Sequence, residues 1–536
     1  DHRQKDSHSN GASSSNGDAT FAGTLTFARY SHDNGTPSSP SDNSVLAIYQ
    51  DRGGVLWFGT HRGGINKIVP HRNRFAHYSR NPLDANSLSD NAVMAFGEDH
   101  DGNLWIGTYA GGLNKLDRRS NRFTHYRHEP GNPNSLSDNN IRSLHVDDNN
   151  VLWIGTRNGG LNTFDPATET FGHFRHDPHD PHSILGDQVI PIFEDRDGDL
   201  WVGIFGSGSS RLDKTTGIFT HFVPDARSAN NLSGKRVFAI EQDHTGTIWI
   251  GTFGDGLNAL DPKTGHFRHY RHARSDTSSL SSDRILAIHE DRVGGLWVGT
   301  FGGGLCKLNR EDGTFRRYTQ KTGLPSNMVL GILDDADGYI WISTSNGLAR
   351  LAPQTGIVNT YDVLDGLQGN SFNSGAAFTS RSGEFFFGGV NGFNAFFPQN
   401  ITDSEYRPPV IITEFKKFNQ SIAGMPESVS LLPGENFFTI EFAALDFSSP
   451  SKNQFAYKMA GLNNEWIYCG TQRSVSYANL RPGFYTFSVR GTNSEGVWSN
   501  TPASLKIVIR PPFCQTAWFY TVAALLLVVG VAIVLT

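Results

Sequence analysis

The chain has 536 residues, a formal net charge of −6 and 37% hydrophobic residues. This length allows two or three domains, and the mildly acidic balance gives no basic face, so nucleic acid is excluded as an expected partner. Glycine is frequent, at 58 residues, and aromatic residues make up 12%. Such a composition favours short strands joined by tight turns over long helices.

The first 20 residues are polar and serine-rich, so we expect residues 1–20 to form a disordered segment. Residue 1 is Asp rather than Met, as after removal of a signal peptide. The three cysteines, Cys306, Cys469 and Cys514, are far apart and match neither a disulfide framework nor a metal-binding pattern.

From residue 54 a tryptophan-containing stretch recurs, as in "GNLWIGTYAGGLNKL" at 102 and "GTIWIGTFGDGLNAL" at 246. The spacing is 48 residues five times and then 44, for Trp57, Trp105, Trp153, Trp201, Trp249, Trp297 and Trp341. An eighth, degenerate copy spans 383–397, with Phe386 in the tryptophan position. A period of this length with strand-like content predicts the blades of a β-propeller.

Each unit separates into four short runs. In the unit around Trp105 these are 92–98, 104–109, 112–117 and 122–127, with the Asp-Gly turn "DHDG" after the first. The segment "TFARY" (26–30) matches the fourth run, and the last unit lacks that run. We therefore predict an all-β protein with a single propeller at 21–400, in which this N-terminal strand closes the last blade. Counting units gives eight blades, with seven as the alternative if the degenerate copy is not a full blade.

One position varies while the frame around it repeats, namely the residue after each "GT" or its equivalent. Propeller geometry gathers these residues into a rim on one face, where aromatic and arginine side chains suit a sugar or another small-molecule ligand. The alternative is that the aromatic residues only wedge between blades. The candidate ligand-binding residues are His61, Tyr109, Arg157, Phe205, Phe253 and Phe301, with Ser345 next in the series.

The other repeated side chains fit structural roles. The tryptophans hold a frame position and are expected in the core. Acidic pairs such as Glu98–Asp99 and Glu290–Asp291 accompany the turn and are expected to hydrogen-bond it or a neighbouring blade. Five histidines lie on outer runs of different blades and diverge, so they form no metal site: His77, His125, His173, His221 and His269. We predict no catalytic residue, no cofactor and no metal.

After a linker at 401–409, residues 410–511 alternate as short strands, which predicts an immunoglobulin-like sandwich. "LRPGFY" (480–485) is typical of a tyrosine corner at Tyr485. Residues 512–536 form a juxtamembrane segment and an uncharged apolar run with aromatic residues at its start, which predicts a single transmembrane helix at 517–535. A buried core helix is the alternative.

The "LWIGT…GGLN" units resemble the two-component-regulator propeller repeats of bacterial sensors. The domain after them is similar to the three-tyrosine (Y_Y_Y) domain, through Tyr457, "GLNNEW" (461–466), Tyr477, "LRPGFYTF" (480–487) and "NSEGVWS" (493–499). The resemblance implies the extracytoplasmic part of a signal-transduction receptor, not itself an enzyme, with residues 1–516 in the periplasm and a span in the inner membrane.

The same resemblance implies a homodimer through the sandwich domain and the helix, an oligosaccharide or other small ligand, and a cytoplasmic histidine kinase or diguanylate cyclase. The chain departs from many polysaccharide-sensing relatives in having one propeller instead of two. Two other functions are the alternatives: a membrane-tethered propeller lyase or glycosidase, and a structural or adhesion module.

Overall fold

The computed structural model describes residues 30–535 apart from 34–38, 70–73, 226, 229, 419, 423, 425, 426, 436 and 516. It divides into two units. One holds residues 72–404, and the other holds the described residues before 72 together with those from 405 onward.

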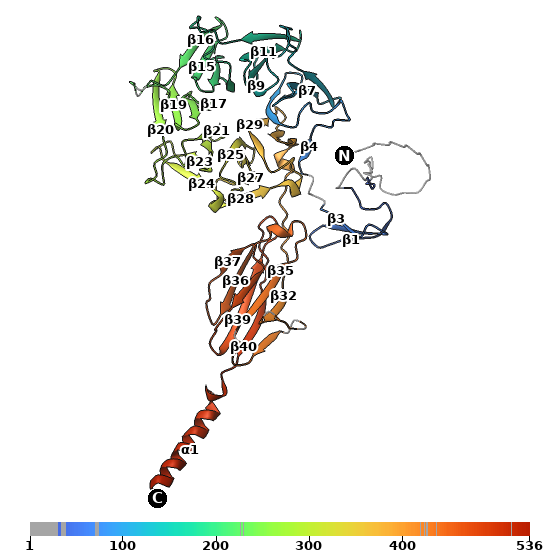
Figure 1. Cartoon of the computed structure of the whole chain (residues 1–536), viewed down its shortest axis with the longest axis vertical. Helices are drawn as coiled ribbons and strands as arrows, with labels where there is room; N and C mark the ends of the chain where they lie inside the picture. The colour runs from blue at the N-terminus through green and yellow to red at the C-terminus, as the bar shows by residue number, and fades with distance from the viewer. Residues whose placement is uncertain are drawn as a thin grey trace, which may run out of the picture. The chain divides into compact units, whose positions relative to one another are not determined.

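The unit 72–404 is a ring of seven four-stranded antiparallel sheets, seen face-on in Figure 1. The first strand of each sheet contacts the first strands of its two neighbours, and β29 contacts β5 to complete the circle. These inner strands are β5 (Val93–Glu98), β9 (Ile141–Val146), β13 (Val189–Glu194), β17 (Val237–Gln242), β21 (Ile285–Glu290), β25 (Val329–Asp334) and β29 (Phe372–Thr379).

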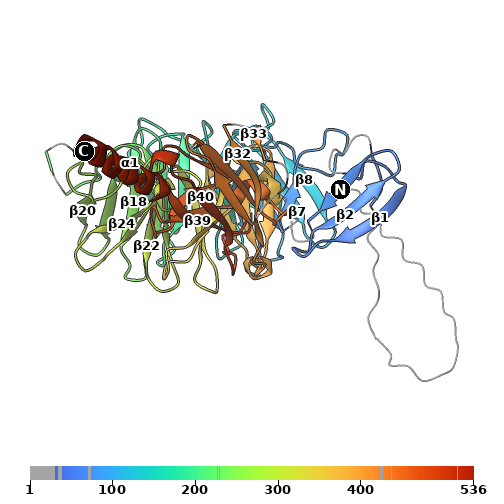
Figure 2. The same ribbon diagram turned by 90° about the horizontal axis from the view of Figure 1, so that it is seen from below.

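The second strands carry the repeated tryptophan and are β6 (Leu104–Thr108), β10 (Leu152–Thr156), β14 (Leu200–Ile204), β18 (Ile248–Thr252), β22 (Leu296–Thr300), β26 (Ile340–Thr344) and, with phenylalanine, β30 (Phe385–Gly389). The third strands are β7 (Leu113–Asp117), β11 (Leu161–Asp165), β15 (Gly208–Asp213), β19 (Leu257–Asp261), β23 (Leu305–Leu308), β27 (Gly347–Leu351) and β31 (Gly392–Phe396). The outer strands are β8 (Arg122–Tyr126), β12 (Thr170–Phe174), β16 (Ile218–Phe222), β20 (His266–Tyr270), β24 (Phe315–Tyr318), β28 (Val358–Tyr361) and β4 (Ala76–Tyr78). In Figure 2 the ring is seen edge-on, with β20, β22 and β24 labelled at its left.

The ring has seven sheets, the alternative count, rather than eight, although the degenerate copy does form a full sheet. The prediction that residues 26–30 close the ring is wrong. Strand β4 pairs with β31, with His77 opposite Asn394, so the fourth strand of the first repeat completes the last sheet. The Tyr78 ring stacks on Phe393 at 4.7 Å and fixes this pairing. Residues 26–29 lie outside the described part, and Tyr30 is exposed and not in a strand.

The rest of the first repeat forms a separate three-stranded sheet of β1 (Val45–Gln50), β2 (Leu56–Thr60) and β3 (Ile65–Ile68). It is not part of the ring. Leu46 and Ile48 are 67% and 74% exposed, whereas their counterparts Met94 and Phe96 are 8% and 5% exposed. Within its own unit this sheet contacts the C-terminal domain, since Trp57 packs edge-on against Phe447 at 5.7 Å.

In each of the seven repeats with a tryptophan, the aspartate of the acidic turn hydrogen-bonds the indole. Asp99 is buried, and its Oδ2 accepts a 2.8 Å bond from the Trp105 indole N–H. Its Oδ1 accepts the backbone N–H groups of Asp101 and Asn103, which holds the turn. Equivalent indole bonds join Trp57 to Asp51, Trp153 to Asp147, Trp201 to Asp195, Trp249 to Asp243, Trp297 to Asp291 and Trp341 to Asp335. The prediction that the acidic residue bonds the turn is confirmed, as is burial of the ring's tryptophans.

The C-terminal domain packs two sheets on one apolar core. The first contains β33 (Gln420–Ser421), β32 (Val410–Lys417), β35 (Phe438–Ala444) and β38 (Ser474–Tyr477). The second contains β34 (Ser428–Leu431), β40 (Ala503–Ile509), β39 (Gly483–Gly491), β36 (Phe455–Ala460) and β37 (Ile467–Gly470). The Tyr485 hydroxyl donates a 2.8 Å bond to the Arg481 carbonyl, which confirms the predicted tyrosine corner.

The chain continues into helix α1 (Ala517–Leu535), which is 19 residues long and contains no charged residue. Among the described residues, no helix is both long enough and apolar enough to cross a membrane. The residues of the predicted span at 517–535 form α1.

Candidate functional site

The rim residues are held by one backbone arrangement that repeats around the ring. The N–H of Tyr109 donates to the carbonyl of Ala92, just before β5, at 2.9 Å, and Thr108 Oγ1 donates to the Gly112 carbonyl at 2.8 Å. Gly112 has φ +78°, and an added Cβ would collide with the Tyr126 carbonyl, so this turn requires glycine. The backbone therefore stays fixed while the side chain at the Tyr109 position varies.

The same main-chain bond recurs at five further ring positions: between Arg157 and Asn140, Phe205 and Gln188, Phe253 and Arg236, and Phe301 and Arg284 at 2.8–2.9 Å, and between Ser345 and Met328 at 3.3 Å. It also holds His61 to Ser44 in the separate β1–β3 sheet. His61 therefore has the predicted backbone position, but it does not belong to the ring.

A second set of variable side chains comes from the inner strands. In six ring sheets the pairing between the first and second strands shifts at the start of the inner strand, as between Val93 and Ala95, and the extra residue is re-aimed by this bulge. The residues at or within this irregularity are Met94, Arg142, Ile190, Phe238, Leu286 and Leu330.

Tyr109 and Arg157 meet across two neighbouring sheets. Arg157 Nη1 donates a 2.6 Å hydrogen bond to the Tyr109 hydroxyl, and the guanidinium carbon lies 5.9 Å from the centre of the Tyr109 ring. Arg142, from the same sheet as Arg157, lies beside it. Burial first, and then repulsion from the Arg157 charge, lowers the pKa of Arg142.

The three rim phenylalanines form a continuous aromatic arc through Phe238. Phe205 lies 6.0 Å from Phe238, Phe238 lies 5.3 Å from Phe253, and Phe253 lies 5.7 Å from Phe301. Two arginines border the arc, since Arg236 lies 5.5 Å from the Phe253 ring and Arg284 lies 5.7 Å from the Phe301 ring. The aromatic residues therefore contact one another between sheets and also keep exposed surface, with Phe205 41% and Phe301 36% exposed.

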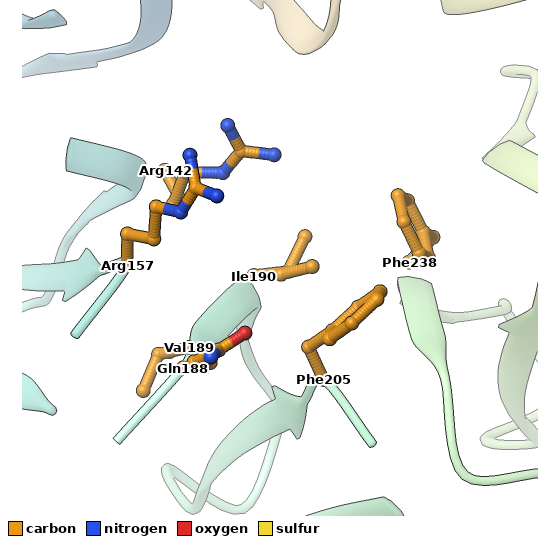
Figure 3. Close-up of a pocket in the computed structure, with 7 residues that line it drawn as sticks. All are labelled: Arg142, Arg157, Gln188, Val189, Ile190, Phe205 and Phe238. Atoms are coloured by element: carbon orange, nitrogen blue, oxygen red, sulfur yellow. The ribbon is translucent and has the colours of Figure 1, made fainter. Parts of the chain in front are cut away.

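A cavity of about 180 Å³ joins the arginine pair to the start of the aromatic arc. It is lined by Arg142, Arg157, Gln188, Val189, Ile190, Phe205 and Phe238. Figure 3 shows the two guanidinium groups together on one side, Phe205 and Phe238 on the other, and Ile190 between them. Cationic donors facing an aromatic wall are groups that suit a polar ligand with one apolar face.

The structure brings together five of the six predicted rim residues and leaves His61 in the other sheet. Sequence reasoning missed Arg142, Gln188, Ile190 and Phe238. The sequence does contain a pattern that could have identified them. They occupy the first and third positions of the inner runs, and these positions vary at the same 48-residue period.

The outer-strand histidines act as structural links. His125 Nε2 lies 2.9 Å from the Ser87 carbonyl, and the rings of His173 and His269 lie 2.9 Å from the side-chain oxygens of Asn162 and Asn258. Among the described residues no group of three His, Cys, Asp or Glu side chains could hold a metal ion.

The sequence profile of the two-component-regulator propeller matches residues 39–62, 87–110, 135–158, 231–254, 279–302 and 323–346. The Y_Y_Y domain profile matches residues 446–510. Each propeller match ends one residue after a rim position, so the family signature covers the frame that presents the rim.

Two relatives extend this likeness. A protein of Formosa agariphila named histidine kinase P4 is 31% identical over 218 residues, which is 38% of this chain and 16% of that protein. A crystal structure described as the extracellular domain of the hybrid two-component system BT3049 of B. thetaiotaomicron is 28% identical, with a TM-score of 0.74 over 90% of this chain and 64% of that one. The chain thus spans about a sixth of the kinase and under two thirds of the solved domain.

A further structure, described as the extracellular domain of BT4673 from B. thetaiotaomicron, shares the fold at 24% identity, with a TM-score of 0.50 over 91% of this chain and 65% of that one. The repeats, the domain after them and these neighbours agree. The chain thus contains six two-component-regulator propeller repeats followed by a Y_Y_Y domain.

Proposed function

We propose that the chain is the extracytoplasmic ligand-sensing part of a membrane-bound two-component sensor, and that its ligand binds at the rim cavity of the propeller. The likeness to the extracellular domain of a hybrid two-component system supports the sensor role. The name of the sequence relative supports a histidine kinase as the output, with a diguanylate cyclase as the other candidate.

The observation that carries the rim assignment is that the backbone at the rim position repeats from sheet to sheet while its side chain varies. The same backbone bond presents a tyrosine, an arginine and three phenylalanines at five consecutive ring positions, and two of these residues, Arg157 and Phe205, line one cavity. A purely structural position would repeat its side chain, as the tryptophan and the acidic turn residue do. Aromatic faces and arginine donors are the groups that hold a sugar ring by stacking and charge-assisted hydrogen bonds.

The relay in this proposal runs through the C-terminal domain and α1. Residues 1–516 lie in the periplasm, and α1 anchors the chain at 517–535 in the inner membrane. The exposed leucines of α1, such as Leu525 and Leu527 at 64% and 69%, support contact with an apolar phase. Two chains pair through the sandwich domain and the helix, and the ligand shifts the pair between two arrangements by binding one of them more tightly.

The rim assignment is tested by binding of the full chain, in detergent, to an array of defined neutral and acidic oligosaccharides. We expect at least one class of glycan to bind, and we expect Phe253→Ala and Phe301→Ala to weaken that binding by about tenfold or more, because each removes a stacking surface. Their melting temperatures should fall by only a few degrees, since Phe301 is 36% exposed and Phe253 is only half-buried.

The matched control is Ile218→Ala, an exposed apolar residue on outer strand β16. It should leave glycan binding unchanged. Absence of binding to every glycan on the array, or equal loss in the control and the rim variants, would contradict the rim assignment.

A further inference from the structure

Two arginines of one sheet share a wall of the rim cavity. Arg142 comes from the bulge of β9, and Arg157 follows β10, its hydrogen-bonded neighbour. Both guanidinium groups line the cavity and lie on the same side of it (Figure 3). Two cations are therefore held at one site by two separate, rigid backbone positions.

The described residues supply no carboxylate within ion-pair distance of Arg142 or Arg157. The Arg157 side chain hydrogen-bonds only the neutral Tyr109 hydroxyl. The nearby connector carboxylates already serve the turns. Asp90 accepts the N–H of Ala110 at 2.9 Å, and Asp138 accepts the N–H of Asn158 at 3.0 Å.

Other partly buried arginines of the ring form ion pairs with carboxylates. Arg310 pairs with both Asp243 and Glu290 at 2.6 Å, and Arg118 pairs with Glu98 and Glu384. These pairs link neighbouring sheets and compensate the desolvation of the guanidinium group. Arg142 is half-buried without such a partner, and Arg157 beside it is exposed and has no carboxylate partner among the described residues, so an anion from outside would pair with both.

The rest of the cavity selects what carries the anion. Phe205 and Phe238 form the wall opposite the arginines, and Ile190 lies between (Figure 3). Such a wall stacks on the apolar face of a ring. The volume of about 180 Å³ is below the roughly 300–1,000 Å³ of pockets for drug-sized ligands, so it has room for one ring or end group rather than a long chain.

We propose that the Arg142–Arg157 pair binds the acidic group of a ring-shaped acid, such as a uronic acid at the end of an acidic glycan, while Phe205 and Phe238 contact its ring. This rests on the proposed function, because it assigns a ligand class to the same rim. The carboxylate would bridge the two guanidinium forks, the geometry in which arginine binds carboxylates most strongly.

The test measures binding of sodium glucuronate, glucose and inorganic sulfate to the full chain in detergent by calorimetry at low ionic strength. We expect glucuronate to bind about tenfold or more tightly than either glucose or sulfate. Arg142→Gln and Arg157→Gln should each weaken glucuronate about tenfold or more while leaving glucose unchanged, and added salt should weaken glucuronate alone.

Arg122→Gln is the matched control, because Arg122 is an exposed arginine on outer strand β8. It should bind glucuronate as the unaltered chain does. Arg142→Lys keeps the charge without the fork and should lose less affinity than Arg142→Gln, which separates a missing charge from a misfolded site.

Equal affinity for glucuronate and glucose, or full glucuronate binding by Arg142→Gln, would overturn the acid site. Sulfate binding as tightly as glucuronate would overturn the contribution of the ring. If the acid site fails while a neutral glycan still binds in a manner sensitive to Phe253→Ala, the rim remains the binding site. If no glycan binds the array either, both proposals fail.

Discussion

At the scale of single residues, the ring separates the side chains that hold it from those that vary. Asp99 satisfies two backbone N–H groups and one indole with a single buried carboxylate, and such a group is costly to remove because it would leave buried donors unpaired. Tyr109, by contrast, is 40% exposed and contacts another rim residue. A change at Tyr109 can therefore alter binding with little effect on folding.

One partly buried acid makes the stability of the ring depend on pH. Burial, partly offset by His289 and reinforced by Glu290, raises the pKa of Glu241 to about 7. The folded state thus holds this proton more tightly than the unfolded chain, whose glutamate titrates near 4.5. The contribution of this group to the free energy of unfolding is fully present below about pH 4.5 and is lost as the pH rises through about 7.

Glu241→Gln should remove this dependence. The free energy of unfolding of the variant, taken relative to that of the unaltered chain, should rise by about 1–3 kcal/mol from pH 5 to pH 8. The reason is that the glutamine carries no charge to desolvate. Urea unfolding at both pH values measures this. The control Glu311→Gln, at an exposed glutamate, should differ from the unaltered chain in free energy of unfolding by the same amount at pH 5 and at pH 8. A pH-independent effect of Glu241→Gln would contradict the role given to Glu241.

At the scale of elements, the closure of the ring depends on one three-residue strand. Strand β4 places His77 opposite Asn394 of the last sheet. In the neighbouring sheet the equivalent pair is His125 and Asn114, within one repeat. If β4 stayed with its own repeat, His77 would instead lie opposite Asn66 of β3. The blade count therefore depends on the partner of His77.

Paired cysteines distinguish the two arrangements. In a chain carrying Cys514→Ser, we expect His77→Cys with Asn394→Cys to form a disulfide on mild oxidation, because directly opposite strand positions bring the Cβ atoms close enough for a bridge. His77→Cys with Asn66→Cys should stay reduced. Non-reducing gel electrophoresis and mass spectrometry of tryptic peptides detect the link, and bridging of the second pair instead would support eight blades.

The repeats, the four strands of each unit, the acidic turn and the tyrosine corner could be predicted because each depends on local sequence. Trp105 needs a partner six residues earlier, and Tyr485 a carbonyl four residues earlier. The closing strand could not be predicted, because outer strands such as 74–78 and 122–126 have nearly the same sequence. Any of them can pair with any third strand, and only the curvature of the assembled ring decides between them.

The rim was predictable to a similar extent. Tyr109, Arg157 and the phenylalanines follow from one variable position in the repeat. Arg142 and Phe238 were missed because a strand with regular alternation would not turn this position toward the rim, and the bulge that does so is visible only in the pairing. His61 was included because its repeat has the same sequence pattern as the others, although the chain uses that repeat outside the ring.

At the scale of the whole molecule, the proposal needs ligand binding at the rim to change the output of the sensor. The ring, the C-terminal domain and α1 follow one another along the chain, so the proposed relay from the rim to the helix runs through the Y_Y_Y domain. Because a ligand shifts an equilibrium only by its difference in affinity for the two states, a variant that binds weakly should also signal weakly at the same ligand concentration.

The most direct test of the sensor account is phosphorylation by the intact sensor in membranes, with glucuronate or the best-binding array glycan as the stimulus. The account predicts that Tyr109→Ala and Arg157→Ala shift the stimulus needed for half-maximal response about tenfold or more upward, with melting temperatures within a few degrees of the unaltered chain. An unchanged response in both variants, or a loss of response that only follows a matching loss of stability, would contradict it.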